Sequence, residues 1–341
     1  MAIQKSNIQD LERITAPEVI VADEGEIRLR PTSLDEYVGQ TQIKDHLKVS
    51  LKSAKIRNEP LEHLLFYGPP GLGKTTLSQI IAREMGRDLR SSSGPAIEKQ
   101  ADILSLLTSL KEHDILFIDE IHRLKPQIEE ILYGAMEDFQ IDIMIGSGTG
   151  ATSVKMDIPK FTLIGATTKL SKLTGPLRDR FGNILKLDFY DISELQTIIK
   201  RSFGVFGQKS SAPIDEFVAK KSRGTPRIAN RYVKILRDYA TVGENTETIE
   251  TVSKIFDNLG IDDVGLDGLD RKLLETLSKH FGGRPVGLGT LASVVGEEES
   301  TLEEVVEPYL LKIGYLERTP RGRQITHAGE QYIHSLSKKS G

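Results

Sequence analysis

The sequence predicts an α/β domain built on a parallel sheet, followed by a small helical domain and a C-terminal winged-helix domain. In the first half of the chain, short apolar runs alternate with longer amphipathic ones, which favours parallel strands covered by helices. After about residue 190 the strand-like runs fade and helical periods take over. Near the C-terminus, three helical periods precede two strand-like runs around a turn, which is the order of a winged helix.

The composition of the 341 residues limits the class of protein. There are 45 basic and 49 acidic side chains, a formal net charge of −4, so any binding of nucleic acid must depend on local patches. The absence of cysteine excludes disulfides, thiolate zinc sites and cysteine nucleophiles. No apolar run approaches the roughly 20 residues of a membrane helix, and the first residues lack the order of an export signal. We therefore expect a soluble, cytoplasmic protein without a membrane partner.

The first domain is expected to span residues 29–190. Residues 1–28, before it, are polar without a sustained period and predict a flexible arm. Apolar residues recur at helical spacing over 34–56. Strands are expected at 64–67, 114–118 and 161–165, with covering helices at 75–85 and 126–139. The run 141–158 has two alternating flanks around Gly, Ser and Thr, which predicts a projecting β-hairpin or, in the plainer interpretation, an ordinary edge hairpin.

Two smaller domains are expected to follow. Residues 191–261 predict a helical domain, in which Ser193 and Gln196 have the spacing of a capping box. Its long helix, 225–240, carries an apolar stripe at Ile228, Tyr232, Ile235 and Tyr239. Residues 262–341 predict the winged helix, with helices at 269–280, 288–295 and 301–313 and strands at 315–318 and 324–326.

The segment GPPGLGKT, residues 68–75, fits the pattern of a phosphate-binding loop and lies between a predicted strand and a predicted helix. Gly71 and Gly73 let the backbone turn its amide groups toward phosphate oxygens. Lys74 supplies a cation to the β- and γ-phosphates, and the Thr75 hydroxyl is placed to bind Mg²⁺. A Gly/Pro-rich turn with a surface lysine is the alternative, but pattern and context together favour binding of a nucleoside triphosphate with Mg²⁺.

Polar side chains close the next two predicted strands. At the carboxyl edge of the sheet, Asp119 can hold magnesium through water while Glu120 polarises an attacking water, so the pair predicts hydrolysis. Thr168 is the residue expected to sense the γ-phosphate or orient the water, with Thr167 as the alternative. Because threonines at strand ends are often only caps, the residues alone leave this role open.

Two arginine motifs follow. Arg178 and Arg180 lie on either side of an aspartate, and an arginine that reached the γ-phosphate of a neighbouring subunit would stabilise the transferring charge and require a ring. A surface salt bridge is the alternative. Arg227 comes just after a proline that fixes the start of the long helix of the helical domain. It could couple phosphate charge to the angle between the domains, or be an ordinary ion-paired arginine.

The turn of the C-terminal hairpin is basic. The turn and the runs beside it carry three arginines, Arg318, Arg321 and Arg323, and Lys312 lies just before them. Clustered guanidinium groups on a turn can contact phosphates without reading sequence. The helix that would ordinarily enter the major groove carries Glu303, Glu304 and Glu307, and phosphate repulsion argues against base readout by that helix. A protein contact with the arginines as a solvated turn is the alternative, and the residues alone favour neither.

Six motifs occur in this order along the chain: GPPGLGKT, LFIDEIH, AMEDF, IGATT, LRDRFG and GTPRIANR. Together they resemble the AAA+ ATPases and, among these, the RuvB family of bacterial motors that drive branch migration at Holliday junctions. The segments LRPTSLDEYVGQ, SSGPAIEK and RTPRGR narrow the resemblance, which covers about residues 29–326. The chain departs from the pattern in its longer polar amino-terminal arm and in loop residues such as Lys99 and Gln100, but no motif position is lost.

The resemblance implies a large ATPase domain, a helical lid and a winged-helix head, with roles for the matching residues. The residues that would hold ATP and Mg²⁺ are Gly71, Gly73, Lys74, Thr75 and Thr76. The residues that would lie near the adenosine are Leu29, Arg30 and Tyr190. A nucleotide-proximal segment would be Glu137, Asp138 and Phe139. Thr168 would be the first sensor, Arg180 a finger acting in trans and Arg227 the second sensor.

The resemblance also implies partners and a function. The 141–158 hairpin would dock RuvA, RuvC would be a functional partner, and the chain would form a ring, expected to be a hexamer. The expected activity is an ATP-dependent DNA motor for branch migration in recombination and repair, acting on duplex arms without sequence preference. A loader or remodelling switch for another protein assembly is the alternative. The acidic recognition helix argues against a transcription regulator, and the pair Asp119 and Glu120 argues against a small-molecule kinase.

Overall fold

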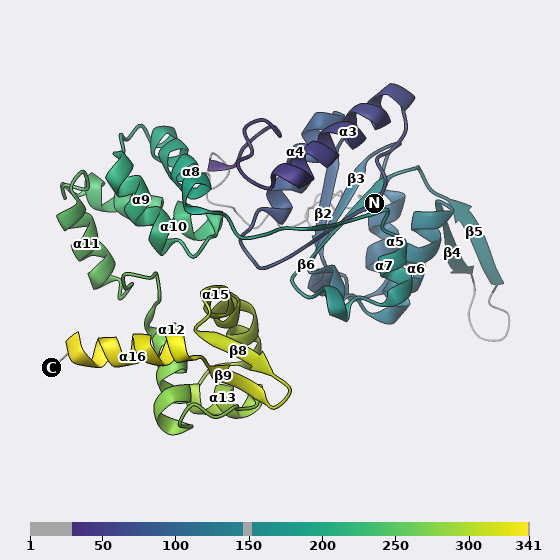
Figure 1. Cartoon of the computed structure of the whole chain (residues 1–341). Coiled ribbons are helices and arrows are strands. Elements are labelled where there is room, and N and C mark those ends of the chain that lie inside the picture. The colour runs from purple at the N-terminus through teal and green to yellow at the C-terminus, as the bar shows by residue number, and fades with distance from the viewer. Residues whose placement is uncertain (1–28, 146–151, 340–341) are drawn as a thin grey trace, which may run out of the picture.

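The computed structural model describes residues 29–145 and 152–339. It has three parts: the first and third contain helices and strands, and the second contains helices only (Figure 1). The expected arm, 1–28, and the centre of the expected hairpin, 146–151, lie outside the described residues. Within the described residues, every helix is too short or too polar to cross a membrane.

The first part is a five-stranded parallel sheet in the order β2-β3-β6-β1-β7. Its strands are β1 (Leu64–Tyr67), β2 (Leu89–Ser93), β3 (Ile115–Asp119), β6 (Thr162–Thr167) and β7 (Asn183–Lys186). The three central strands match the three expected ones, since strands buried on both faces form continuous apolar runs. The two edge strands, β2 and β7, are partly exposed and were not anticipated, because they lack such runs.

Helices cover both faces of this sheet and bury two separate cores. They are α3 (Thr41–Arg57), α4 (Lys74–Met85), α5 (Gln100–Thr108), α6 (Pro126–Glu137) and α7 (Gly175–Asp179). In β1, Leu64 and Phe66 pack with the core of α3 and α4, whereas Leu65 packs with the core of α5 and α6. Successive side chains of a strand point to opposite faces, so one short strand serves both cores.

The expected helix over 34–56 begins only at Thr41. Gly39 and Gln40 have φ angles of 77° and 50°, in the left-handed region, which interrupts a right-handed helix. The apolar residues before this point are still used, because Leu34 and Tyr37 are buried in the same core as α3. The helical spacing was therefore a correct signal for burial and a wrong one for the start of the helix.

The expected β-hairpin is confirmed. Strands β4 (Gln140–Ile145) and β5 (Thr152–Asp157) pair antiparallel, and Figure 1 shows them at the end of the first part that lies farthest from the helical part. Ile141 at the base of β4 is buried in the core of α5 and α6, whereas Val154 on β5 is 44% exposed. The hairpin thus has an anchored base and an apolar side chain on its surface.

The second part consists of α8 (Ile192–Val205), α9 (Ala212–Lys221), α10 (Pro226–Thr241) and α11 (Ile249–Asn258). The capping box of α8 is formed by Asp191 and Glu194, not by Ser193 and Gln196. The Asp191 carboxylate accepts from the Glu194 amide at 2.7 Å, and the Glu194 carboxylate accepts from the Asp191 amide at 2.9 Å. Ser193 lies inside the first turn, where its hydroxyl donates to Asp191.

The buried face of α10 is rotated relative to the expected stripe. Its buried side chains are Ala229, Tyr232, Val233 and Leu236, and three of the four stripe residues, Ile228, Ile235 and Tyr239, are only partly buried at its margin. The fourth, Tyr232, is buried, and the small Ala229 lies on the same buried face.

The third part is a winged helix with its own core. Its elements are α12 (Gly268–Glu275) continued by a π-helical turn (Thr276–His280), α13 (Leu288–Val295), α14 (Glu299–Thr301), a second π-helical turn (Leu302–Val306), α15 (Glu307–Lys312), β8 (Leu316–Thr319), β9 (Gly322–Ile325) and α16 (His327–Lys339). The expected three helices and hairpin are present, and the final helix α16 was not anticipated.

A buried arginine joins the second part to the third. Arg223, between α9 and α10, is 7% exposed and has a φ of 54°. Its Nε donates to Gly265 O at 2.7 Å, and its Nη2 lies 2.6 Å from the fully buried Asp270 carboxylate and 2.9 Å from that of Asp267. Nearby, Lys221 Nζ donates to the carbonyl oxygen of Asp262 at 2.6 Å. Buried charged hydrogen bonds of this kind fix the two parts relative to each other.

Candidate nucleotide-binding site

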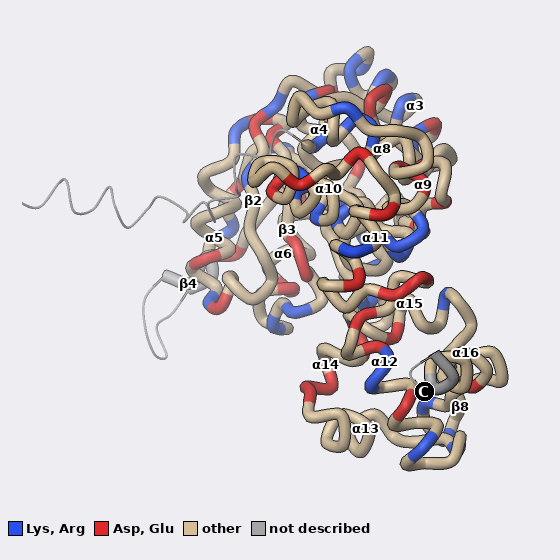
Figure 2. Tube along the Cα trace, turned by 90° about the vertical axis from the view of Figure 1, so that its left-hand side faces the viewer, with Lys and Arg blue, Asp and Glu red and all other residues tan. Residues whose placement is uncertain are grey.

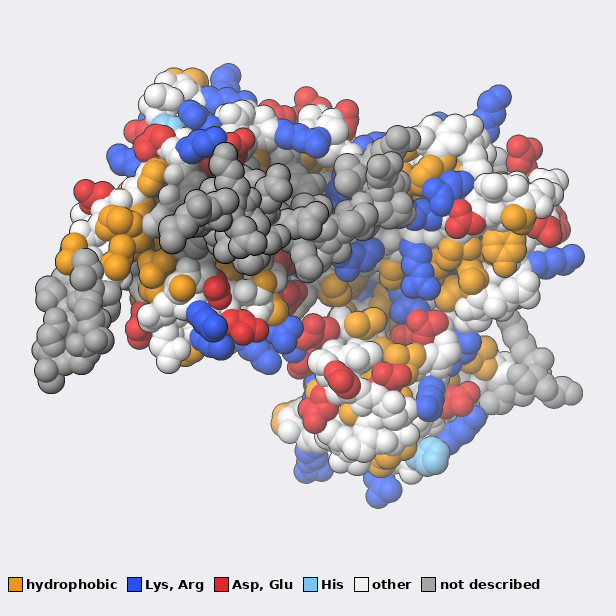
Figure 3. Space-filling model, turned by 180° about the vertical axis from the view of Figure 1, so that it is seen from behind, with side chains coloured by type: hydrophobic (Ala, Val, Ile, Leu, Met, Phe, Trp, Pro, Cys, Tyr) orange, Lys and Arg blue, Asp and Glu red, His pale blue; other side chains and the backbone are white. Residues whose placement is uncertain are grey.

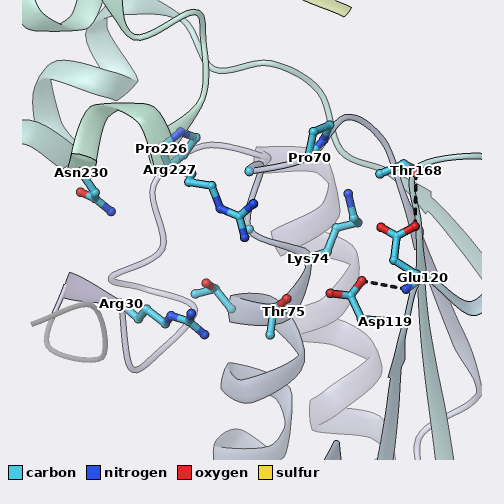
Figure 4. Close-up of a pocket in the computed structure, with 13 residues that line it drawn as sticks. Arg30, Pro70, Lys74, Thr75, Asp119, Glu120, Thr168, Pro226, Arg227 and Asn230 are labelled. Atoms are coloured by element: carbon cyan, nitrogen blue, oxygen red, sulfur yellow. Dashed lines mark hydrogen bonds between the residues drawn. The ribbon is translucent and has the colours of Figure 1, made fainter. Parts of the chain in front are cut away.

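A pocket lies at the carboxyl ends of β1, β3 and β6, closed on one side by the first turn of α10 (Figure 4). This is the edge at which ligands bind in open α/β sheets. Most of the residues expected in the nucleotide site come together here. The lining residues are Arg30, Pro70, Gly71, Gly73, Lys74, Thr75, Thr76, Asp119, Glu120, Thr168, Pro226, Arg227 and Asn230.

The phosphate loop has the strained backbone that its glycines allow. Gly71 and Gly73 have φ angles of 81° and 99°, and a Cβ on Gly73 would lie 2.6 Å from Tyr37 Oη. Lys74 Nζ donates to the carbonyl oxygens of Gly68 and Pro69 at 2.8 and 2.9 Å. Burial lowers the pKa of Lys74 to about 8, against the opposing effect of the two acids at the end of β3. A bound polyphosphate would favour the charged ammonium, so Lys74 is suited to bind an anion.

Tyr190 lies beneath the phosphate loop and does not line the pocket, although it was expected near the adenosine. Its hydroxyl donates to Tyr37 Oη at 2.9 Å, and Tyr37 in turn donates to the carbonyl of Leu72 at 3.2 Å. Burial raises the pKa of Tyr190 to about 12, so it stays a neutral donor. Of the other two residues expected near the adenosine, Arg30 lines the pocket and Leu29 is buried outside the lining.

The two acids at the end of β3 face the phosphate loop. The backbone of Glu120 has a φ of 48°, in the left-handed region that residues other than glycine rarely adopt. Its amide donates to Asp119 Oδ1 at 2.9 Å, which fixes the two carboxylates relative to each other. Burial, and next to it the charge of Asp119, raises the pKa of Glu120. A strained, partly desolvated carboxylate in a pocket is typical of a functional base.

The two candidate sensor threonines have different surroundings. Thr168 lines the pocket, and its hydroxyl donates to Glu120 Oε2 at 3.5 Å. Thr167 is fully buried and lies 2.9 Å from His122 Nδ1. The geometry therefore favours Thr168 over Thr167 as the residue that could contact a ligand. Sequence reasoning did not single out His122, whose Nδ1 is 3.4 Å from Glu120 Oε2, although it lies only two positions after this acid.

Arg227 enters the pocket from the first turn of α10, so the site is shared by the first and second parts. Its amide donates to the carbonyl of Gly71 at 3.4 Å, and its charge contributes to the low pKa of Lys74. Asn230, which was not anticipated, lines the pocket one turn further along α10. Helical spacing from Arg227 could have identified it, because residues three apart share a helix face.

Arg180 and the segment 137–139 lie outside the pocket. Arg180 Nη2 is 2.9 Å from Glu137 Oε2, and its guanidinium lies 4.6 Å from the centre of the Tyr133 ring. Asp138 is exposed, and Phe139 packs edge-on against Phe161. The structure brings the expected finger into contact with Glu137 of the expected nucleotide-proximal segment, and neither residue lines the pocket of its own chain.

The wing arginines are not equivalent. Arg318 and Arg323 both bind Glu307, each with a closest distance of 2.6 Å, and this carboxylate is completely buried. Arg323 is 17% exposed and Arg318 is 48% exposed, whereas Arg321 at the turn is exposed. Lys312 lies away from the wing, with its Nζ 4.5 Å above the Phe189 ring. Glu307 was expected on the helix that would ordinarily enter the major groove. It is instead buried beneath the wing, where it holds Arg318 and Arg323.

The residues at the pocket fit a nucleoside triphosphate with Mg²⁺. In the described ranges, no group of three or more His, Asp or Glu side chains is arranged to hold a metal alone. Mg²⁺ in nucleotide sites takes only one or two protein ligands and completes its shell with phosphate oxygens and water. The Thr75 hydroxyl and the Asp119 carboxylate, both in the lining, can supply these.

Three family models match the chain in sequence order. They are described as the Holliday junction DNA helicase RuvB P-loop domain, matching residues 29–187, the RuvB AAA lid domain, matching 190–262, and the RuvB C-terminal winged helix domain, matching 263–334. The chain is 50% identical over 327 residues to the Holliday junction branch migration complex subunit RuvB of Dehalococcoides mccartyi (strain CBDB1), covering 95% of this chain and 94% of that one.

Solved structures agree with this match. The RuvB Holliday junction branch migration motor of Thermotoga maritima is 48% identical with a TM-score of 0.83, covering 90% of this chain and 98% of that one. A single-residue mutant of the same protein gives the same identity, coverage and TM-score.

Proposed function

The chain belongs to the RuvB family, and we propose from this premise that it hydrolyses ATP to drive branch migration at Holliday junctions during recombination and repair. The observation that carries the proposal is the pocket, in which a phosphate loop, a pair of acids and an arginine from a second domain converge in a chain that ends in a winged helix. We take the domains to be 29–190, 191–261 and 262–341. A loader for another protein assembly is not favoured.

The proposed division of labour in the pocket follows from its chemistry. Gly71 and Gly73 expose the loop amides, and Lys74 and Arg227 bring cations toward the phosphates. Thr75 and Asp119 would hold Mg²⁺, which when bound neutralises phosphate charge. Thr76 and Arg30 complete the lining. Tyr190 would support the loop from beneath through its hydrogen bond to Tyr37, and the buried Leu29 would act next to Arg30 near the adenosine.

Glu120 is the proposed general base. Its raised pKa, caused first by burial, makes the carboxylate more basic than a solvated glutamate. It would accept the proton of the attacking water, and Thr168, 3.5 Å from its Oε2, would orient that water or contact the γ-phosphate. Arg227 on α10 would report the phosphate charge to the lid.

Arg180 is the proposed finger acting in trans. Its position outside its own pocket, beside Glu137, supports a role at the site of a neighbouring subunit. Asp138, which is exposed next to Glu137, would approach that neighbour's nucleotide with it, and Phe139 would support the segment from the core, where it packs against Phe161. A site completed by two subunits requires a ring, which we expect to be a hexamer.

We expect Gly94→Ala to lower ATP turnover by about tenfold to a hundredfold, because a misplacement of a catalytic group by about 1 Å has effects of this size. A Cβ on Gly94 would overlap the carbonyl oxygen of Glu120 and push its backbone away. Gly204→Ala on α8 is the matched control, since a Cβ there meets nothing within 4 Å. Turnover is measured at saturating ATP, and equal rates for the two variants would show that Glu120 is not held by this contact.

The wing is the proposed DNA contact. We expect Arg321→Ala to weaken binding to duplex DNA at every sequence and to reduce the slope of log affinity against log salt by about 1, because one phosphate contact is lost. Arg318 is half-exposed and contributes as well. Arg323→Ala, in contrast, is expected to destabilise the winged helix by about 2 kcal/mol, because the buried Glu307 loses one of its cations.

Salt titrations of DNA binding and thermal unfolding separate these two effects. If Arg321→Ala lowered the melting temperature and left the slope of log affinity against log salt unchanged, Arg321 would not be a DNA contact. DNA binding by the Arg323→Ala variant, measured below its unfolding transition, shows whether Arg323 also contacts DNA directly.

RuvA is the partner we expect at the β4–β5 hairpin, with RuvC as a further functional partner. The exposed apolar Val154 on β5 supports a docking role, and Figure 3 shows hydrophobic side chains gathered beside the hairpin. The proposed function as a whole is tested by measuring ATP turnover without DNA, with linear duplex and with a four-way junction, each with and without RuvA. Turnover that ignored both DNA and RuvA would favour the loader instead.

A further inference from the structure

An ion pair connects the sensor strand to the winged helix. Lys169 directly follows Thr168, and its Nζ lies 2.5 Å from Glu303 Oε2 and 2.8 Å from Glu304 Oε1. Burial lowers the pKa of Lys169, but the hydrogen bonds and negative charges of the two carboxylates together raise it by more, and the hydrogen bond with Lys169 lowers the pKa of Glu303. Both partners are therefore charged at neutral pH. Figures 1 and 2 both place the α15 side of the winged helix toward the ATPase domains.

The two acids reach Lys169 from the π-helical turn Leu302–Val306. A π-helical turn has an extra residue compared with an α-helical turn and often occurs at functional sites. Glu303 and Glu304 on this turn face the ATPase domain, whereas Glu307, directly after it, is buried beneath the wing. The same short segment therefore contacts the sensor strand on one side and the wing arginines on the other.

On the ATPase side, hydrogen bonds continue from Lys169 to the catalytic glutamate. The Lys169 amide donates to Thr167 Oγ1 at 2.9 Å, and this oxygen lies 2.9 Å from His122 Nδ1. The same His122 nitrogen is 3.4 Å from Glu120 Oε2. Thr168 donates to that carboxylate from the adjacent position. A shift of the loop at Lys169 would move both groups that touch Glu120.

On the other side, the charges continue to the wing. Arg323 lies 3.8 Å from Glu303 and binds Glu307, which also binds Arg318. A DNA phosphate that draws Arg318 away from Glu307 would change the charge balance of the turn that holds Lys169. The proposed DNA contact and the catalytic glutamate are thus linked by named contacts.

We propose that Lys169 is a positioning residue that ties the sensor loop to the winged helix and holds Thr168 on Glu120 in a low-turnover arrangement until the winged helix moves. In this arrangement the Thr168 hydroxyl donates to Glu120, so it does not donate to a phosphate or a water. Release of the ion pair frees both groups for hydrolysis. The inference rests on the proposed function, because it concerns how ATP turnover at this site responds to DNA.

The test compares Lys169→Met with Lys172→Met in the full-length chain. Lys172 is an exposed lysine three positions away, and its replacement is expected to change nothing. For Lys169→Met we expect the turnover number without DNA to rise about 3- to 10-fold, the KM for ATP to change little, and stimulation by duplex DNA to be lost, as expected for an allosteric contact of ordinary strength. A fall in turnover, or behaviour like that of Lys172→Met, would overturn the proposal.

A charge swap separates coupling from a purely structural role. Lys169→Glu alone should be uncoupled from DNA, and adding Glu303→Lys should restore stimulation because the pair is rebuilt with reversed charges. Failure of the double variant to recover DNA stimulation, with unchanged thermal stability, contradicts a role for the pair. A failure of the proposed function itself would be distinguishable, because the wild-type protein would show no ATP turnover, or turnover that does not respond to DNA.

Discussion

Replacing Glu120 by Gln is expected to lower ATP turnover by about 10²- to 10⁴-fold, the usual contribution of a general base. Glutamine has nearly the same shape, so the backbone amide of residue 120 can still donate to the Asp119 carboxylate. The glutamine side chain, however, cannot accept a proton from water. ATP should still bind, because the groups that face the phosphates, Lys74 and Arg227, are unchanged. Steady-state turnover and the dissociation constant of a fluorescent ATP analogue measure the two effects separately.

The matched control for this variant is Glu130→Gln, which removes an exposed carboxylate from α6 and should leave turnover unchanged. If Glu120→Gln kept more than about a tenth of the wild-type turnover, another group would be the base. His122 would then be the next candidate, because its Nδ1 lies 3.4 Å from Glu120 Oε2.

Arg180→Ala is expected to lower turnover by about 10³-fold or more, as for other arginines that stabilise a transferring phosphoryl group in trans. Arg178→Ala is the control, because this arginine lies two positions earlier, in the short helix that Arg180 caps, with a half-exposed side chain. Both variants should bind ATP normally, since neither residue lines the pocket of its own chain.

Mixing tests the trans assignment directly. Lys74→Met and Arg180→Ala subunits are each inactive alone, but an interface with Lys74 on one side and Arg180 on the other is intact. In a random mixture of equal amounts, about one interface in four is intact, because each required subunit is present with a probability of about one half. We expect turnover to return in that proportion if interfaces act independently. A mixture as inactive as its components would rule out a shared site.

The residues that bind phosphates could be predicted because their chemistry is local in sequence. The phosphate loop, Asp119 and Glu120 each combine a fixed spacing with a strand that ends at one edge of the sheet. The structure was needed to distinguish Thr168 from Thr167, since the two are adjacent at the end of β6 and only Thr168 lines the pocket.

The parts that could not be predicted depend on contacts between distant segments. Glu307 is an example, because an acid in a helix next to basic residues gives no sign of being buried beneath them. Tyr190 is another, since its place under the loop depends on Tyr37, 153 positions earlier. In the sheet, the continuous apolar strands were predictable, whereas four of the five residues of the edge strand β2 are polar, so that it resembles a loop in sequence.

The buried Arg223 has a mechanical consequence. Because it binds both Asp267 and Asp270 within the joint, we expect the helical lid and the winged helix to move as one rigid body. Any rotation of the lid would then displace the tip of the wing farther than the lid itself, since displacement grows with distance from the pivot. For the proposed motor, a small movement at the nucleotide would therefore produce a larger one where DNA is held.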